Sequence, residues 1–280
     1  MSRNVIDDSR NRTEPEQPTM HIEQVHNKDR IEALLRRDAE LHIYSLGDLD
    51  EFFWPATTWY GWEQGGALQE VVLVYAGRVR PTVVGISPDP ERMTALLREA
   101  APLLPPRFHA HLSGGVEAAL RDTHALGPPE PHYRMALRDV ARARDIDGSD
   151  VVGLGERDRD DLLALYEKSY PGNWFDATML QTGQYFGVRA QGKLVSAAGV
   201  HVYSPAYRVA ALGNITTHPD HRNRGYARRV TARLCRSLLA RVDHIGLNVK
   251  TDNEIALRCY EKLGFETIAP FNEFDVERKL

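Results

Sequence analysis

One arginine-rich stretch that contains a glycine constrains the fold of this chain more than any other: His218-Pro219-Asp220-His221-Arg222-Asn223-Arg224-Gly225-Tyr226-Ala227. An apolar run typical of a strand, residues 209–217, comes before it, and an amphipathic run, residues 227–240, follows it. The order predicts a loop in which free backbone N–H groups lie at the N-terminus of a helix, and such a junction attracts phosphate. Gly225 lets the backbone turn sharply, and the small Ala227 leaves the entrance to the helix open. We therefore predict an anion-binding loop.

The composition is that of an ordinary globular protein. The 280 residues fit one large domain or two of moderate size. Hydrophobic residues make up 42% and charged residues 26%, which is typical of a folded chain with its own core. Because 35 Lys and Arg residues stand against 39 Asp and Glu residues, the net charge is −4, and we expect no nucleic-acid partner. The arginines beyond the first turn of the helix after the loop are interpreted as a solvated face.

Cysteine content and hydropathy exclude several classes of protein. The two cysteines, Cys235 and Cys259, each fall inside a predicted helix, which argues against a disulfide framework and against a metal cluster, so no metal is expected. No apolar run approaches the roughly 20 residues that span a bilayer, so we expect no membrane partner and a cytoplasmic location. Residues 1–19 are polar and lack periodicity, and they are predicted to form a disordered tail.

Residues 20–147 are predicted to form an N-terminal α/β domain. The predicted helices are 29–41, 90–104 and 115–123, and the predicted strands are 71–75, 82–86, 108–112 and 133–137. Aromatic residues crowd the segment 52–62. We interpret this segment as core or interface, and the alternative is a stacking surface for a ligand.

Two local matches suggest an internal repeat. Ser87-Pro88-Asp89 follows a predicted strand as 218–220 does, and Glu117–Arg121 resembles Glu254–Arg258. Either the first half is a degenerate copy that lacks the anion-binding loop, or the matches are coincidental. Residues 138–150 alternate arginine with aspartate and are interpreted as a linker, so we place a domain boundary near residue 148.

Residues 148–280 carry the loop inside a second α/β pattern. The predicted strands are 185–189, 194–202, 209–217, 245–249, 265–268 and 274–278. The predicted helices are 158–168, 227–240 and a last helix that opens at 251–254 and closes at Gly264. Gly213 within its strand suggests a bulge or a close ligand approach. Thr251 to Glu254 fits a capping box, and Gly264 is expected to end the last helix. Asn253 and Tyr260, about two turns apart, are expected on one face beside the loop.

Two motifs in residues 148–280 resemble those of the GNAT (GCN-related) N-acetyltransferase family. Arg222–Ala227 fits the Arg/Gln-x-x-Gly-x-Gly/Ala acyl-CoA loop, and Asn253–Phe265 fits Asn-x-x-Ala-x-x-x-Tyr-x-x-x-Gly-Phe. The sequence of residues 217–220 resembles that of the subgroup that includes glycine N-acyltransferases. Members with two copies of the domain, one of them degenerate, also occur in the family, and mycothiol synthase is among them. The resemblance implies an α/β (α+β) fold with a mixed, mostly antiparallel central sheet flanked by helices. The N-terminal domain is either a degenerate copy of that fold or an unrelated one.

The resemblance also implies a site for acetyl-CoA or another acyl-CoA. The diphosphate would bind the loop N–H groups and Arg222 or Arg224, and the pantetheine arm would pair with the strand before the loop. The implied cofactor-binding residues are Ile215, Thr216, Thr217, Arg222, Asn223, Arg224, Gly225, Tyr226, Ala227, Asn253 and Tyr260.

Three residues are candidates for catalysis. Tyr260 would give a proton to the departing CoA thiolate, and the alternative is a packed tyrosine. Many family members carry a glutamate on the strand before the loop, but residues 209–217 contain none. Asn214 could instead orient a water, or His201 could act as the base, although a histidine at a strand end is often only a surface residue. Cys235 and Cys259 are interpreted as packing residues, which favours direct transfer.

We therefore expect an acyl-CoA-dependent N-acyltransferase that transfers acetyl from acetyl-CoA to an amino group of a small molecule or peptide. Residues 173–176, Tyr203, Tyr207 and the aromatic segment near Trp54 are candidates to line the acceptor site by their position. Two alternatives stay open. The first is a protein that binds acyl-CoA as a signal without turnover, which the missing glutamate would suit. The second is an interaction scaffold whose loop binds no CoA.

Overall fold

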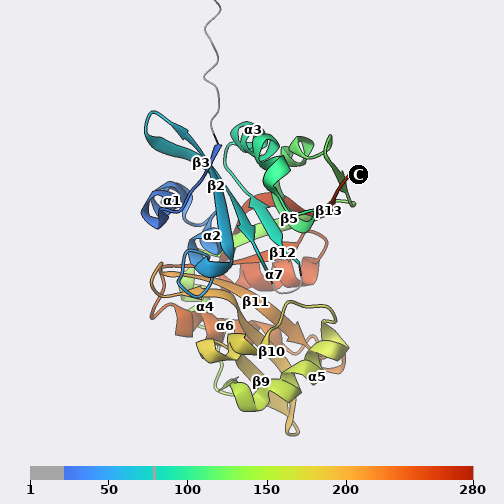
Figure 1. Ribbon diagram of the computed structural model, residues 1–280. Helices are drawn as coiled ribbons and strands as arrows, with labels where there is room; N and C mark the ends of the chain where they lie inside the picture. Colours follow the sequence, from blue (N-terminus) through green and yellow to red (C-terminus); the bar gives the residue numbers. More distant parts are fainter. Residues whose placement is uncertain (1–21, 78–79, 280) are drawn as a thin grey trace, which may run out of the picture.

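The computed structural model describes residues 22–77 and 80–279, so the predicted tail, residues 1–19, lies outside the described residues. The described strands join one 13-stranded mixed sheet, seen along its length in Figure 1. In sheet order they are β1 (Ile22–Gln24), β2 (Thr57–Gln64), β3 (Ala67–Tyr75), β4 (Thr82–Gly85), β5 (Arg107–Ser113), β13 (Phe265–Arg278), β7 (Glu130–Leu137), β12 (His244–Lys250), β11 (Val209–Thr217), β10 (Lys193–Ser204), β9 (Phe186–Ala190) and β8 (Val152–Gly153), and β6 (His124–Leu126) pairs with β13. Two pairs, β4 with β5 and β11 with β12, are parallel, and the other pairs are antiparallel. The expected mixed, mostly antiparallel sheet is confirmed.

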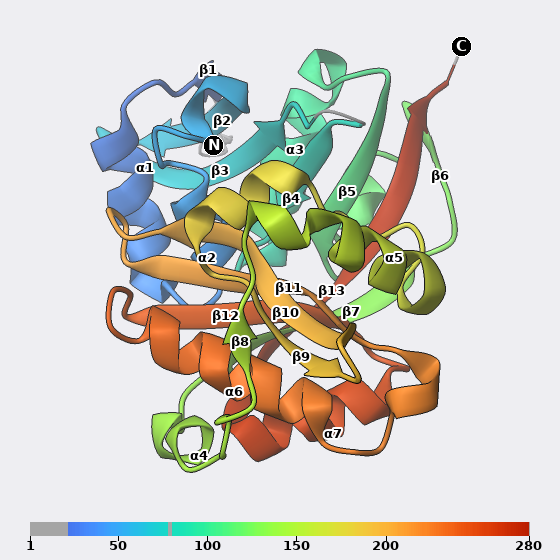
Figure 2. The same ribbon diagram turned by 90° about the horizontal axis from the view of Figure 1, so that it is seen from below.

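Helices cover both faces of this sheet. They are α1 (Lys28–Leu35), α2 (Ile43–Gly47), α3 (Pro90–Ala100), α4 (Val140–Arg144), α5 (Arg159–Ser169), α6 (Tyr226–Leu238) and α7 (Glu254–Leu263). In Figure 2, α6 and α7 lie side by side along the C-terminal strands, and α5 lies on the other side of them. The amphipathic helix predicted at 227–240 is confirmed by α6, whose Val230, Leu234 and Leu238 are buried in the core. Among the described residues, every helix is too short or too polar to cross a bilayer.

The two ends of the sheet mirror one another in strand order. Strand β13 lies between β5 and β7, and β7 lies between β13 and β12. The last strand of each half therefore sits within the strands of the other half. From one end of the sheet, an antiparallel run that begins at β1 leads to the parallel pair β4–β5 and then to β13. From the other end, an antiparallel run that begins at β8 leads to the parallel pair β11–β12 and then to β7. This order supports the internal repeat, while the division of the chain at residue 148 stays a prediction.

Several predicted elements differ from the structure. Residues 115–123, predicted as a helix, contain only a short 3-10 turn, Val116–Ala119. The predicted linker at 138–150 contains α4, whose Ala143 is buried against the core. The two predicted C-terminal strands form one long strand, β13, with a register shift between Thr267 and Ala269. With this shift, the two predicted segments continue as one strand and no turn separates them.

The aromatic segment at 52–62 contributes to the core, as interpreted from the sequence. Trp59 is fully buried and stacks with Trp54 at a centroid distance of 6.5 Å. Phe52, in contrast, is 69% exposed.

Candidate active site

Strands β11 and β12 separate part of the way along their length. They pair in parallel at 209–211 with 244–246, and β11 has no β12 partner beyond Ala211 among the described residues. In the first half, β4 stays paired with β5 as far as Gly85. The separation leaves main-chain groups of β11 from Leu212 onward without sheet partners on the β12 side. A ligand with an extended amide chain can pair with such an edge.

A β-bulge lies in β11 at the separation. Ala197 pairs with Thr216 while Gly199 pairs with Gly213, so three steps along β11 match two along β10. Asn214 takes up the extra residue with φ +54°, which is a left-handed conformation. The bulge that Gly213 suggested is confirmed.

The loop 218–225 joins β11 to the N-terminus of α6 and forms a concave set of backbone N–H groups. Asn223 and Gly225 have φ of +61° and +76°, and alternation of left- and right-handed residues turns successive N–H groups inward. Within the described residues, the N–H groups of 223–227 donate to no backbone carbonyl outside α6 and to no side chain. A Cβ built on Gly225 would meet no atom within 4 Å, so the space beside it is open. The arrangement can receive an anion.

The loop arginines are exposed and pair with no described carboxylate within 4.0 Å. Arg222 Nε donates to Thr217 O at 3.4 Å, and Arg224 Nη2 donates to Asp220 O at 3.4 Å. Arginines further along α6 have structural partners: Arg229 pairs with Asp150 at 3.2 Å, and Arg236 donates to the Ile146 carbonyl at 2.6 Å. Arg222 and Arg224 are therefore the loop cations available to an anionic ligand.

The corresponding junction in the first half is closed by side chains. Asp89 is the N-cap of α3 and accepts from Arg92 N at 3.0 Å, so a carboxylate of the protein occupies the helix N-terminus. Ser113 Oγ accepts from Ser87 N at 3.0 Å and donates to Ser87 O at 3.1 Å. The buried carboxylate of Glu70 accepts a hydrogen bond from Ser87 Oγ. A second anion would meet negative charge here.

Helix α7 carries the two remaining motif residues, Asn253 and Tyr260. The capping box predicted to start at Thr251 is wrong, because Asn253 is the N-cap and its Oδ1 accepts from Ala256 N at 3.2 Å. Asn253 is exposed, whereas Tyr260 is 9% exposed and packs against Phe265 at a centroid distance of 5.9 Å. Gly264 ends the helix with φ +95°, as predicted. Burial raises the pKa of the Tyr260 hydroxyl well above its usual value, so the group keeps its proton.

His201 and Asn214 belong to one hydrogen-bonded chain. Asn214 Nδ2 donates to Tyr185 Oη at 2.9 Å, and Tyr185 Oη donates to Val200 O at 3.1 Å. Asn214 Oδ1 then accepts from His201 Nε2 at 3.2 Å, which assigns the proton to Nε2 and the lone pair to Nδ1. The imidazole lies over Gly213, where a Cβ would come within 2.2 Å of His201 Cδ2. Burial lowers the pKa of His201, and the Asn214 hydrogen bond opposes this.

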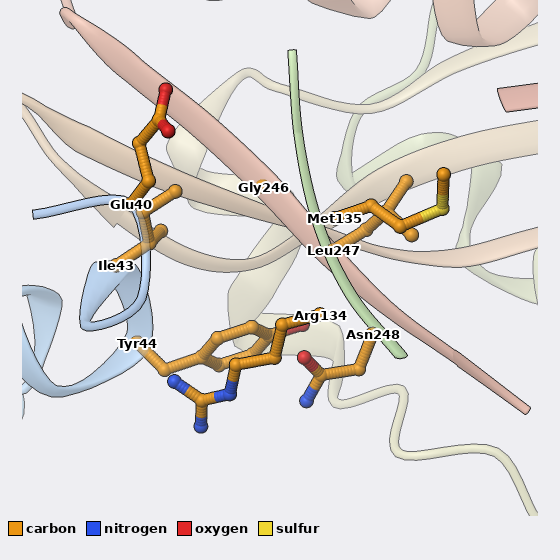
Figure 3. A pocket seen from close by; sticks show the side chains of 8 residues that line it. All are labelled: Glu40, Ile43, Tyr44, Arg134, Met135, Gly246, Leu247 and Asn248. Atoms are coloured by element: carbon orange, nitrogen blue, oxygen red, sulfur yellow. The ribbon is translucent and has the colours of Figure 1, made fainter. Parts of the chain in front are cut away.

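Arg134 lines a small pocket beside the separated part of β12 (Figure 3). Its guanidinium lies 5.5 Å from the ring centroids of Tyr44 and of Phe271, and its Nη1 donates to the Leu41 carbonyl. Burial lowers the pKa of Arg134 to about 10. Nε and Nη2 of this 3% exposed residue have no hydrogen-bond partner among the described residues. Asn248 Oδ1, which lines the same pocket, is also buried without a partner.

A cluster of histidines and carboxylates that the sequence analysis did not single out lies on β5, β13 and β7. Glu273 Oε2 is 3.1 Å from His109 Nε2, and Glu273 Oε1 is 3.4 Å from His111 Nε2 and 3.7 Å from His132 Nε2. Burial alone would raise the pKa of Glu273, but the His109 hydrogen bond and the neighbouring imidazoles lower it to about 2. The alternation of His109 and His111 on a strand was the available signal.

The residues predicted to line the acceptor site fall into separate groups. Trp174 is 53% exposed, and its ring centroid lies 6.3 Å from that of His109. Phe175 packs against Tyr166 and Tyr185. Trp54 and Tyr207 instead pack on a different core cluster, with α1 and α2. Loop 173–176 is thus the part of the predicted set that lies near the polar cluster.

Comparison with known proteins gives a family match for the C-terminal half. The model of the acetyltransferase (GNAT) family matches residues 152–265. An acetyltransferase of Yersinia pestis is 41% identical over 51 residues, which cover 18% of this chain and 36% of that protein. The chain thus matches about a third of the length of such curated relatives.

Solved structures share the fold over most of the chain. A GNAT-family protein from Novosphingobium aromaticivorans has 23% identity and a TM-score of 0.55, covering 75% of this chain and 89% of that one. A tandem GNAT protein from the clavulanic acid biosynthesis pathway has 15% identity and a TM-score of 0.57, covering 92% and 98%. These likenesses concern the fold, and the second extends it to both halves.

Proposed function

We propose that the protein is an acyl-CoA-dependent N-acyltransferase, because the model of the acetyltransferase (GNAT) family matches residues 152–265. Its reaction is the transfer of acetyl from acetyl-CoA to an amino group of a small molecule or peptide. One observation carries the proposal: β11 separates from β12 beside the loop that precedes α6, and the N–H groups of that loop have no acceptor among the described residues. An extended chain with a diphosphate at one end matches both features.

This geometry supports the following cofactor-binding roles. The diphosphate binds the N–H groups of residues 223–227, with Arg222 and Arg224 as countercharges. Pantetheine amides pair with the main chain of residues 215–217, as an added strand would. The thioester then reaches the bulge, where a main-chain N–H stabilises the oxyanion. Asn253 caps α7 and contributes to the site through the position of that helix.

Transfer proceeds by direct attack. The lone pair of a neutral amine forms a bond to the thioester carbonyl carbon, and negative charge develops on the carbonyl oxygen. Collapse of this intermediate breaks the C–S bond, and the CoA thiolate takes the hydroxyl proton of Tyr260. The new amide nitrogen loses a proton to the base, and Tyr260 regains its proton from solvent.

His201 is our candidate for the base. Its Nδ1 carries the lone pair because Nε2 donates to Asn214, and its lowered pKa keeps it neutral at pH 7. Asn214 therefore acts as a positioning residue that fixes the tautomer. In the alternative mechanism, Asn214 orients a water that accepts the proton.

The test measures CoA binding and thiol release separately. Acetyl-CoA at 100 times its dissociation constant is expected to stabilise the protein by about 2.7 kcal/mol. A panel of small-molecule and peptide amines is then assayed for release of CoA thiol. Binding together with amine-dependent release supports the enzyme. Binding without release from any amine class would instead identify a non-catalytic acyl-CoA sensor, and no stabilisation would overturn both ideas.

A further inference from the structure

Two histidines and two carboxylates lie together where the two halves of the sheet join: His109, His111, Glu273 and Asp275. His109 and His111 alternate on β5 and so point to the same face. Strand β13 pairs with β5 in a register that sets Glu273 opposite His111 and Asp275 opposite His109. Figure 1 shows β5 and β13 side by side, although they are far apart in the sequence. Both halves of the chain therefore contribute to this cluster.

The separations of the polar atoms are those of ligands that share one ion. Nε2 of His109 and Nε2 of His111 lie 3.1 Å and 3.4 Å from the two oxygens of Glu273. The ligand atoms of the three residues all lie within 4.8 Å of one another. Zinc binds nitrogen and oxygen at about 2.0–2.2 Å, so the ligand atoms of a tetrahedral site lie roughly 3.3 Å apart.

The outer hydrogen bonds orient the ring nitrogens toward the centre. His109 Nδ1 faces Asp275 Oδ1 at 3.2 Å, and His132 Nδ1 faces the Glu130 carbonyl at 2.9 Å. A carbonyl only accepts, so His132 Nδ1 donates to Glu130 O and the other ring nitrogen, Nε2, faces Glu273 Oε1 at 3.7 Å. Carboxylate and carbonyl partners on the remote ring nitrogen are usual for metal-bound histidines.

We propose that His109, His111 and Glu273 bind one divalent transition-metal ion, zinc foremost, at the junction of the two halves. Two imidazoles and a carboxylate are a ligand set that zinc favours. Their side chains are 17–19% exposed, so solvent reaches the site. Three protein ligands leave a tetrahedral ion one open coordination position. Trp174 lies beside His109, and His132 lies beside Glu273. Because its ligands come from β5 and β13, the ion links the two halves.

Metal binding is measured on the full chain after treatment with EDTA. Zinc chloride is titrated by calorimetry and competition, and cobalt(II) chloride by its visible absorption. We expect one equivalent to bind to the wild type, and Glu273→Gln and the double variant His109→Ala/His111→Ala to bind at least tenfold more weakly. Asp275→Asn, which changes the outer hydrogen bond to His109 and the ion pair with Arg80, is expected to weaken binding by about 10-fold to 100-fold.

Matched controls separate the site from general metal binding. Glu266→Gln changes another carboxylate of β13, one that pairs with Arg138, and His244→Ala changes a histidine of β12; both are expected to bind zinc as the wild type does. Far-ultraviolet circular dichroism and affinity for acetyl-CoA show whether each variant is folded. Equal zinc affinity in the wild type and in a folded Glu273→Gln variant would overturn the proposal.

A second measurement locates the ion. Cobalt(II) is expected to quench the fluorescence of Trp174, whose ring lies beside His109, and Trp174→Phe is expected to abolish most of that quenching. Quenching that persists in Trp174→Phe at full amplitude would place the ion elsewhere and would also overturn the proposal. Neither readout depends on turnover, so metal binding and acyltransfer can fail independently.

Discussion

Tyr260 combines a buried ring with a hydroxyl that retains its proton. If it protonates the CoA thiolate, Tyr260→Phe removes the proton and little else. We expect kcat to fall about 100-fold or more, as loss of a general acid does, while the dissociation constant of acetyl-CoA changes by less than about twofold. Steady-state kinetics and calorimetry check this. Unchanged kcat would assign Tyr260 to packing.

The pH dependence of turnover reports on His201. Burial lowers its pKa below the usual value of about 6.5, and the Asn214 hydrogen bond raises it in part. A base acts when neutral, so kcat/KM should be constant near pH 7 and fall as the pH drops through the lowered pKa. Asn214→Ala removes the hydrogen bond that raises the pKa of His201, so the fall of kcat/KM at acid pH should move to lower pH. If the acid side of the kcat/KM profile is unchanged in Asn214→Ala, a water is favoured as the base.

At this scale, the sequence predicts local chemistry better than remote chemistry. The loop 222–227 and Tyr260 could be singled out because their partners lie within one strand-loop-helix pattern. Glu273 could not, since its neighbours His109 and His111 are more than 160 positions away and meet it only through strand register. Tyr185 was missed for the same reason: its bond to Asn214 exists only across the sheet.

The loop before α6 and the loop before α3 are corresponding elements with opposite electrostatics. One presents unpaired N–H groups and two arginines, and the other is capped by Asp89. Gly225→Arg should fill the open space beside Gly225 and impose strain at φ +76°, so acetyl-CoA affinity should fall at least 100-fold.

The matched control for this loop is Gly115→Arg. Gly115 has φ +90° and open space around it, but it lies in the first half. Its backbone strain should be similar while acetyl-CoA binding stays normal. Calorimetric titration of both variants decides the matter, and normal affinity in Gly225→Arg would mean that the diphosphate binds elsewhere.

The closed loop of the first half should make stability depend on pH. Burial raises the pKa of Glu70 to about 7, opposed by the Ser87 hydrogen bond. Folding then favours the protonated form, so the contribution of Glu70 to the free energy of unfolding is greatest below about pH 4.5 and is lost as the pH rises to 7. The loss is of the order of 3 kcal/mol at most. Glu70→Gln should flatten this fall.

Chemical denaturation between pH 5 and pH 8 measures the effect. Glu91→Gln, at an exposed position in the first turn of α3, serves as the control and should keep the wild-type slope. If Glu70→Gln retains that slope as well, the carboxyl does not titrate as its burial implies.

Elements with strong periodicity could be predicted, and short ones could not. The strand at 209–217 agrees with β11 at both ends, because its apolar run is bounded by a turn signal. Residues 115–123 look helical, but Gly115 with φ +90° and the tight turn at 116–119 lead instead into β6. The cap of α7 was misplaced by two residues, since Thr251 and Asn253 are both good N-caps.

The whole molecule is built on strands exchanged between its halves. Because β7 pairs with β12 and β13 of the second half, and β13 pairs with β5 and β7 of the first half, the halves should stay together after the connection between them is cut. We expect a chain with a protease site inserted after the exposed Ser149 to remain one species on size exclusion after cleavage. It should also unfold in one thermal transition.

A chain with the same insertion in the β2–β3 turn at Gly65 and Gly66 is the control, because that cut falls within one half. Elution of the cleaved Ser149 variant as two independent species would contradict the exchange. The exchange could not be predicted, because residues 130–137 show only that a strand is present and not which strands it pairs with.

The position of β13 has a consequence for synthesis on the ribosome. Strand β5 is complete by residue 113, yet its partner β13 ends at residue 278, so the edges of β5 and β7 that pair with β13 stay open until residues 265–278 have been synthesised. Open strand edges pair readily with other chains, and contacts of such long sequence separation form slowly. The nascent first half is therefore expected to depend on chaperones, and aggregation should increase when synthesis stops before β13 emerges.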